Sequence, residues 1–143
     1  MLRKTVIGRQ EKVDFPLLQL FDVAVKIDTG AYTASLNCCS IREEADGLYC
    51  VFLDATNPSY TAQEYLFKQY SLKWIKSSNG ALQQHYKIST DLLIGGQIQS
   101  IECTLSNRST MRYPVLLGRK FLKNKYLVDV SKTYTLHKRN HKR

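Results

Sequence analysis

Apolar and polar positions alternate along much of the chain. The alternating runs are short and are separated by residues that favour turns. Alternation with a period of two is typical of β-strands. Few segments show apolar residues at the three- to four-residue spacing of an amphipathic helix. The pattern predicts strands over residues 15–27 with a break near 20–22, and over 34–41, 48–53, 72–76, 83–89, 92–94, 98–105, 115–117 and 126–130. One short helix is expected over residues 119–125. We therefore predict an all-β fold.

Turn residues are predicted to join neighbouring strands into hairpins. The turn sequences are Ala45-Asp46-Gly47, Ser77-Ser78-Asn79-Gly80 and Gly95-Gly96. Glycine and asparagine favour tight turns because both tolerate a positive φ. No segment repeats at a fixed period. We expect one domain over residues 1–131, followed by a basic tail over residues 132–143.

The composition is that of one folded domain. A chain of 143 residues has room for one hydrophobic core, and 43% apolar with 23% charged residues excludes a disordered chain. The net charge is +9, yet residues 132–143 hold five of the 21 basic residues and none of the 12 acidic ones, so the body carries +4. A modestly basic body favours an acidic partner, and the basic tail is a candidate contact for nucleic acid.

Location and cofactors follow from what the sequence lacks. No apolar stretch approaches the ~20 residues of a membrane-spanning helix, and no apolar segment follows the basic N-terminus. We therefore expect a cytoplasmic protein that does not enter membranes and keeps its cysteines reduced. Its cysteines and histidines show no zinc-binding spacing, and no phosphate-binding loop is present, so we expect no metal and no cofactor. These cysteines and histidines are Cys38, Cys39, Cys50, Cys103, His85, His137 and His141.

Two segments carry the chemistry. The apolar strand at residues 23–27 leads directly into Asp28-Thr29-Gly30-Ala31, where Gly30 permits a tight turn and the Thr29 hydroxyl can pin it. About ninety residues later the chain reads Val115-Leu116-Leu117-Gly118-Arg119. Together they resemble the two-part signature of retropepsin-type aspartic proteases.

The resemblance extends over about residues 23–130. It includes the turn Ser77-Ser78-Asn79-Gly80, the segment Asn107-Arg108-Ser109-Thr110-Met111 and the pair Tyr113-Pro114. With these segments the chain is similar to the bacterial retropepsin-like family formerly labelled "ATP-dependent zinc protease", whose RimB members are associated with RimK-type glutamate ligases. The resemblance implies a retropepsin-like closed barrel with one short C-terminal helix, active as a homodimer.

The resemblance also implies which residues act. Asp28, Thr29 and Gly30 would form the catalytic loop. Peptide hydrolysis by this route needs two carboxylates that share one proton, so that one activates water while the other protonates the carbonyl oxygen. The chain holds a single Asp-Thr-Gly, so the second carboxylate is expected from Asp28 of another copy. The implied substrate-binding residues, with residues 77–80 as the flap, are Ala31, Ser77, Ser78, Asn79, Gly80, Leu116 and Arg119.

The chain departs from the family pattern at two places. The arginine equivalent to Arg119 normally pairs with an acidic residue just beyond the catalytic aspartate, and here that loop reads Ala31-Tyr32-Thr33. Tyr32 is a candidate replacement contact. Many relatives place a histidine after the leucine in the next strand, where this chain has Leu36-Asn37.

We predict an aspartic endopeptidase, and a glutamate-modified ribosomal protein is a candidate substrate. The basic residues expected to attract an acidic substrate are Lys73, Lys76, Lys87, Arg112 and Arg119. Two alternatives stay open at this point. One is a non-catalytic basic module that binds RNA or the ribosome, in part through the tail. The other is a regulator of a RimK-type ATP-grasp ligase.

Overall fold

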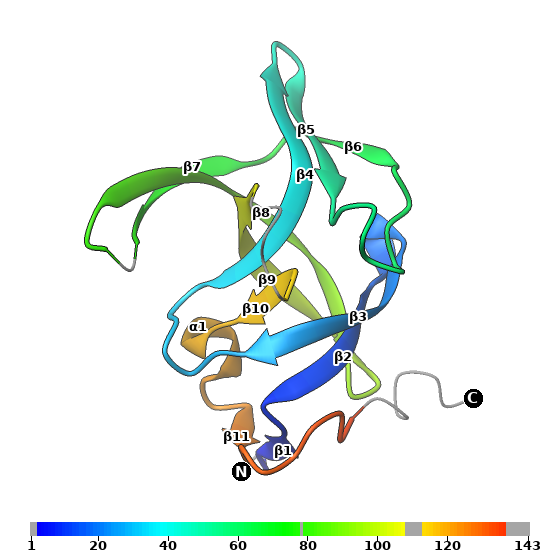
Figure 1. The fold of residues 1–143 in the computed structure, drawn as a ribbon, viewed down its shortest axis with the longest axis vertical. Helices are drawn as coiled ribbons and strands as arrows, with labels where there is room; N and C mark the ends of the chain where they lie inside the picture. The colour runs from blue at the N-terminus through cyan, green and yellow to red at the C-terminus, as the bar shows by residue number, and fades with distance from the viewer. Residues whose placement is uncertain (1–2, 78, 108–112, 137–143) are drawn as a thin grey trace.

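The computed structural model describes residues 3–77, 79–107 and 113–136, and it is mainly β, as the sequence predicts (Figure 1). One 3-10 turn, η1 (Pro16–Leu18), and one short helix, α1 (Arg119–Leu122), interrupt the strands. The strands are β1 (Thr5–Ile7), β2 (Gln10–Phe15), β3 (Leu20–Ile27), β4 (Ala34–Glu44), β5 (Gly47–Phe52), β6 (Glu64–Phe67), β7 (Ser71–Lys76), β8 (Leu82–Ile94), β9 (Gln97–Ser106), β10 (Val115–Leu117) and β11 (Tyr126–Val128).

The pairings of the large sheet return to the strand where they begin. Its order is β10-β3-β2-β8-β9-β4-β5-β6, and β10 pairs with β4 as well as with β3. Most neighbours are antiparallel, whereas β10 with β3 and β4 with β9 are parallel. Strand β7 pairs only with the first half of β8, so this hairpin projects beyond the body (Figure 1). The sheet thus provides both a rigid base and a projecting arm.

The structure moves some predicted boundaries. The break in residues 15–27 comes at residues 16–19 instead of 20–22, because Pro16 cannot donate to a strand ladder and Gln19 adopts φ 54°. Residues 83–89 and 92–94 belong to one strand, β8, which pairs with β9 without a break. The helix ends at Leu122. Residues 10–14 of β2 were not predicted as strand. Strands β1 and β6 were not predicted either, since three- and four-residue strands carry little periodic signal.

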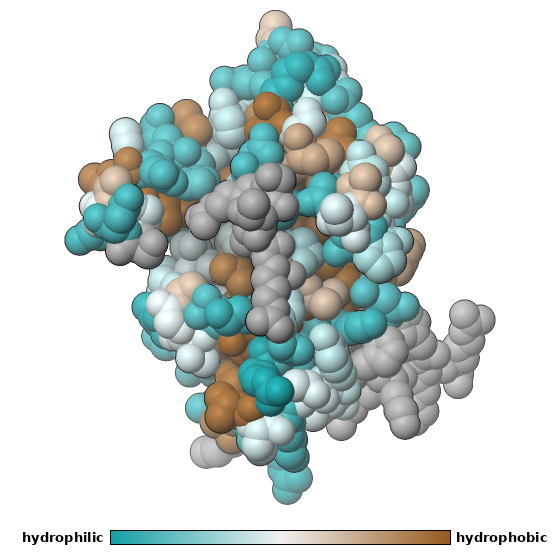
Figure 2. All heavy atoms as spheres, viewed as in Figure 1, coloured by the Kyte–Doolittle hydropathy of each residue, from teal (hydrophilic) through white to brown (hydrophobic). Residues whose placement is uncertain are grey.

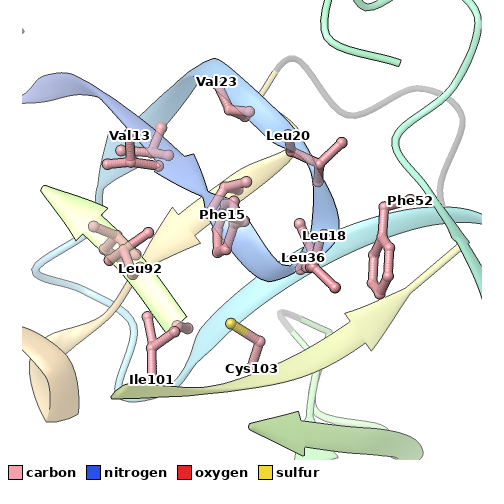
Figure 3. Packing of buried hydrophobic residues seen from close by; sticks show 14 of the residues in the cluster. Val13, Phe15, Leu18, Leu20, Val23, Leu36, Phe52, Leu92, Ile101 and Cys103 are labelled. Carbon is pink, nitrogen blue, oxygen red and sulfur yellow. The ribbon is translucent and has the colours of Figure 1, made fainter. Parts of the chain in front are cut away.

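Buried apolar side chains from β2, β3, β4, β8 and β9 fill the space inside the sheet (Figure 3). The alternation along β4 buries Cys38 and leaves Cys39 exposed, as expected for adjacent residues of a strand. The side chains labelled in Figure 3 are Val13, Phe15, Leu18, Leu20, Val23, Leu36, Phe52, Leu92, Ile101 and Cys103. This packing holds the strands that support the candidate site.

A buried carboxylate joins the end of the described chain to its beginning. Glu11 is 0% exposed and accepts hydrogen bonds from the backbone N–H groups of Gly8 (2.8 Å), Thr135 (3.2 Å) and Leu136 (3.0 Å). The Thr135 hydroxyl also donates to it at 2.7 Å. Residues 133–136 of the expected tail therefore contact β2. Residues 137–143 lie outside the described residues, and the boundary at residue 131 stays a prediction.

We expect Glu11→Gln to lower the free energy of unfolding by about 2–4 kcal/mol, because an amide N–H replaces an accepting oxygen among buried donors. Urea unfolding followed by circular dichroism measures the change. The control is Glu44→Gln. The exposed Glu44 carboxylate pairs with Arg42 at 3.1 Å, and its loss should lower the free energy of unfolding by less than about 0.5 kcal/mol. Equal losses in the two variants would contradict the role assigned to Glu11.

Candidate active site

Backbone hydrogen bonds hold Asp28 at the end of β3. The Asp28 N–H donates to the carbonyl of Leu117 in the adjacent strand β10 at 2.9 Å. The Gly30 N–H donates to Asp28 Oδ1 at 3.0 Å, and the Ala31 N–H donates to the Asp28 carbonyl at 3.2 Å. The Asp28 side chain is half-buried at the start of a tight turn. Its carboxylate is therefore both oriented by the loop and reachable from solvent.

The second motif clamps the loop that follows Asp28. The N–H groups of Arg119 and Lys120 donate to the carbonyls of Ala31 (2.8 Å) and Tyr32 (2.9 Å). The Arg119 guanidinium donates to the Thr29 carbonyl at 3.1 Å, and its central carbon lies 5.8 Å from the centre of the Tyr32 ring. A carbonyl and an aromatic face thus take the place of the acidic partner that this chain lacks. The contact expected of Tyr32 is confirmed.

Gly118 permits this clamp because the two segments nearly touch there. A Cβ atom at residue 118 would lie 2.6 Å from the Thr33 carbonyl oxygen and 2.7 Å from the carbonyl carbon and oxygen of Tyr32. Contacts this short to backbone atoms cannot be relieved by a side-chain rotation. Gly118 is therefore required by the close approach of the loop, and its backbone φ of −93° is ordinary.

Gly118→Ala is expected to push the two motifs apart and to lower the free energy of unfolding by about 1–3 kcal/mol. Thermal and urea unfolding measure the loss. Gly30→Ala is the comparison, since its Cβ would meet only Asp28 Oδ1 at 3.3 Å. If Gly118→Ala lowers the free energy of unfolding no more than Gly30→Ala does, the close approach at residue 118 does not constrain the loop.

The projecting hairpin of β7 and β8 ends in a built turn. The Ser77 N–H donates to the Ala81 carbonyl at 2.8 Å, and the Gly80 N–H donates to the Ser77 carbonyl at 2.9 Å. The Asn79 side-chain oxygen accepts from the Ser77 hydroxyl and from the Ala81 N–H. Gly80 has φ +88°, which suits glycine. The expected flap residue Ser78 lies outside the described residues.

The base of this hairpin is tied to β4 through tyrosines. The hydroxyls of Tyr70 and Tyr86 both donate to the Glu43 carboxylate, the latter at 3.3 Å, and their rings lie 5.8 Å apart. The hydrogen bond to Glu43 raises the pKa of Tyr70 to about 12. The hairpin is therefore anchored at its base while its tip projects on the same side of the molecule as α1 and the β3–β4 loop (Figure 1).

One face of the hairpin is apolar and exposed. Leu72, Trp74 and Leu82 are 51%, 62% and 64% exposed, and the strand register puts them on the same face. Figure 2 shows brown, apolar spheres on the hairpin beside teal, polar ones. The intervening residue Lys73 points to the opposite face, because side chains alternate along a strand.

A pocket of about 150 Å³ lies on that opposite face, against the chain that leaves the Asp28 loop. Its wall includes Thr33, Lys73 of β7, and an ion-pair cluster in which Glu102 contacts Lys120 at 2.6 Å and Lys87 at 3.3 Å. The two ammonium groups, Lys120 first, lower the pKa of Glu102 below its ordinary value. The same pairing raises the pKa of Lys120.

Lys120→Gln should return the pKa of Glu102 toward the ordinary value, as measured by NMR titration, whereas Lys123→Gln should not. In the folded chain the pKa of Glu102 is lowered, so its ion pairs stabilise the fold above the ordinary pKa of 4.5. That contribution is lost as the pH falls through the lowered value. It should amount to less than about 1 kcal/mol, because the Glu102 side chain is 40% exposed. An unchanged titration in Lys120→Gln would contradict this assignment.

The structure brings part of the expected site together and leaves part separate. Asp28, Thr29, Gly30, Ala31 and Arg119 share the clamped loop. Leu116 is half-buried in β10, beside β3. The described flap residues Ser77, Asn79 and Gly80 lie on the separate hairpin. Their roles stay predictions.

The sequence did not reveal that Gly118 contacts the Asp28 loop, or that Lys120 and Lys125 line a pocket with Lys73 and Lys87. Gly118 could be recognised as part of the motif, but its contact with the Asp28 loop could not be predicted from the sequence. Of the basic residues expected to attract substrate, Lys73 and Lys87 line the pocket and Arg112 lies outside the described residues.

The histidines and cysteines form no metal-binding group in the described part of the chain, although the thiols of Cys38 and Cys50 are hydrogen-bonded to each other. His85 is part of β8, where its ring nitrogens contact the Leu105 carbonyl at 3.0 Å and the Gln83 side-chain oxygen at 3.3 Å. His137 and His141 lie outside the described residues. No group of three potential metal ligands occurs in residues 3–77, 79–107 and 113–136. Over the same ranges, no helix has the length and apolar character needed to span a membrane.

Comparison with known families agrees with this geometry. The family model described as "Retropepsin-like aspartic endopeptidase RimB" matches residues 6–139. The chain belongs to the RimB-like family of retropepsin-like aspartic endopeptidases. The match takes in the Asp28 loop, the hairpin and the Gly118-Arg119 segment, so the resemblance drawn from the motifs is confirmed.

The curated relatives carry a different kind of name. A "Probable alpha-L-glutamate ligase" of Shewanella halifaxensis (strain HAW-EB4) is 33% identical over 142 residues, which is 96% of this chain and 31% of the relative. Its counterpart from Shewanella pealeana (strain ATCC 700345 / ANG-SQ1) is 33% identical over 138 residues, with 93% and 30% covered. The chain thus spans just under a third of the length of these relatives.

A solved structure shares the fold. The crystal structure of a Legionella pneumophila protein of unknown function superposes with a TM-score of 0.70 at 26% identity. The alignment covers 94% of this chain and 99% of that protein.

Proposed function

We propose that the chain is an aspartic endopeptidase whose active site forms between two copies, with Asp28 of each at the two-fold axis. The observation that carries the proposal is the Asp28 loop, held by β10 and by Arg119, in a chain of the retropepsin-like family. Residues 28–33 contain no second acid and no other Asp-Thr-Gly occurs, so the partner copy supplies the second carboxylate. The ring of pairings that returns to β10 supports the closed barrel expected of this family.

In the proposed reaction one Asp28 is ionised and the other is protonated. The ionised carboxylate takes a proton from water as the water oxygen attacks the peptide carbonyl carbon, and the protonated one donates to the carbonyl oxygen. Collapse of the tetrahedral intermediate breaks the C–N bond, and the amine leaves with a proton from a carboxyl group. The products are a carboxylic acid and an amine, and no further reactant is needed.

The remaining expected residues have supporting roles in this proposal. Thr29 holds the two loops together across the dimer, and Gly30 offers its backbone to the substrate. Ala31, Leu116 and Arg119 line the cleft. The turn at residues 77–80 covers the peptide as a flap, and its anchored base at Tyr70 and Tyr86 supports a hinged arm over the cleft.

The proposed substrate is a glutamate-modified protein, such as a ribosomal protein in the cytoplasm. The relatives named glutamate ligases support this, because the present chain aligns with a part of each. Attraction of an acidic chain by the basic body supports it as well. The same names support a second candidate, in which the chain regulates a RimK-type ATP-grasp ligase without cleaving peptides.

Asp28→Asn is expected to abolish peptide cleavage, with a fall of at least about a thousandfold, while the melting temperature stays near that of the wild type. Release of new amino groups from glutamate-bearing peptides measures the rate. The control is Asp54→Asn, a half-buried loop carboxylate that accepts from the Thr56 N–H at 2.9 Å and should leave cleavage intact. Equal restoration of a ligase by the wild type and Asp28→Asn would favour the regulator.

Mixing the two proteins tests whether the site is shared. Excess Asp28→Asn added to the wild type should lower the activity per wild-type chain, because mixed dimers hold one carboxylate. Activity that stays constant through the titration would show that one copy is sufficient and would overturn the shared site. Sedimentation at the assay concentration checks that dimers are present.

A further inference from the structure

The pocket beside the catalytic loop collects lysines from three parts of the chain. Lys73 comes from β7, Lys87 from β8, and Lys120 and Lys125 from α1 and the segment after it. Glu102 is the only acidic residue among the described residues of its wall. With four lysines and one glutamate, these residues give the wall a net charge of +3.

Two of these lysines have no acidic partner in the described part of the chain. The Glu102 carboxylate is fully engaged, with Oε1 on Lys120 and Oε2 on Lys87. Among the described residues no carboxylate pairs with Lys73 or Lys125, and the Lys125 ammonium lies 4.7 Å from the centre of the Phe121 ring. Uncompensated ammonium groups in a concavity attract an anion more strongly than the same groups on a convex surface.

The rest of the wall suits an aliphatic chain that ends in a carboxylate. Ile101 and Phe121, which are 4% and 6% exposed, contribute apolar atoms to the same wall. The volume of about 150 Å³ is smaller than the roughly 300–1,000 Å³ of pockets for free metabolites. It matches one side chain of a longer molecule. Thr33 and Ala34 place the pocket next to the Asp28 loop, so that molecule would extend toward the cleft.

We propose that this pocket is a specificity subsite that binds a glutamate side chain of the peptide substrate, with Lys73 and Lys125 contacting the carboxylate. The proposal rests on the proposed endopeptidase function and adds the place where the acidic side chain of the substrate binds. Methylene groups of the glutamate pack on Ile101 and Phe121, and the carboxylate pairs with the ammonium groups of Lys73 and Lys125. Lys73 belongs to the hairpin, so a bound glutamate also links the hairpin to the body.

The observations favour a peptide over a nucleic acid. Single-stranded RNA is bound by exposed aromatic faces together with basic groups. Trp74 lies on the opposite face of β7, and Phe121 is only 6% exposed in the pocket wall, with the Lys125 ammonium 4.7 Å from the centre of its ring. The pocket therefore offers ammonium groups without a stacking surface.

The test measures binding to the Asp28→Asn protein, so that cleavage does not interfere. The probes are a fluorescent peptide rich in glutamate, the same peptide with glutamines, and one with phosphoserines. We expect the glutamate peptide to bind at least about tenfold more tightly than the glutamine peptide, from charge-assisted contacts. Adding Lys73→Gln and Lys125→Gln should remove this preference. The matched control, Lys68→Gln with Lys123→Gln, removes the same charge from exposed residues outside the pocket and should keep it.

Each contrary result has a definite meaning. Equal binding of glutamate and glutamine peptides, or equal loss in the pocket and control variants, would overturn the subsite. Tighter binding of the phosphoserine peptide would assign the pocket to phosphate, and displacement of the peptide by RNA would assign it to nucleic acid. Either outcome also overturns the proposal.

The wild-type protein separates the subsite from the endopeptidase. Selective binding without cleavage by the wild type would leave the subsite standing and would refute the endopeptidase. Cleavage that is equally fast with glutamate and glutamine peptides would do the reverse. Circular dichroism of every variant checks that the fold is unchanged.

Discussion

The parallel contact between β3 and β10 is the constraint on which the candidate site depends. It pairs Ile27 with Leu117 and continues into the bond from the Asp28 N–H to the Leu117 carbonyl. Strand β3 is also paired with β2, so both of its edges are occupied before it ends. Asp28 therefore follows a strand whose register is fixed by neighbours on both edges. Its position follows from the register of the sheet.

The contact between the Asp28 loop and the Gly118-Arg119 segment depends on the absence of a side chain at residue 118. Because Gly118 adds no Cβ, the backbones of the two motifs meet, and Arg119 reaches the Thr29 carbonyl and the Tyr32 ring. An acidic partner for Arg119 would place a second carboxylate in the loop. With neutral partners instead, Asp28 is the only acid of residues 28–33. The loop is thus held without adding a negative charge beside the proposed catalytic group.

The sequence predicted the hairpins well because each depends on a few adjacent residues. Alternation sets the strands, and Asp46-Gly47, Asn79-Gly80 and Gly95-Gly96 set the turns. The misplaced break shows the limit of this approach. Alternation predicted a strand that begins at residue 15 and breaks at residues 20–22, but β2 covers residues 10–15 and ends before Pro16, which cannot donate to a ladder. The short strand β1 pairs with β11 near the other end of the described chain, and β6 pairs with the preceding strand β5.

The sequence by itself determined the family, the identity of the Asp28 loop and its link to Gly118-Arg119, since these are local motifs with definite turn chemistry. Only the tertiary structure decided which charges meet. Glu11 is buried under residues 133–136, and the lysines of the pocket come from three segments between residues 73 and 125. Such meetings depend on strand register and on the way the sheet curves back to β10. Neither is encoded in any short stretch of residues.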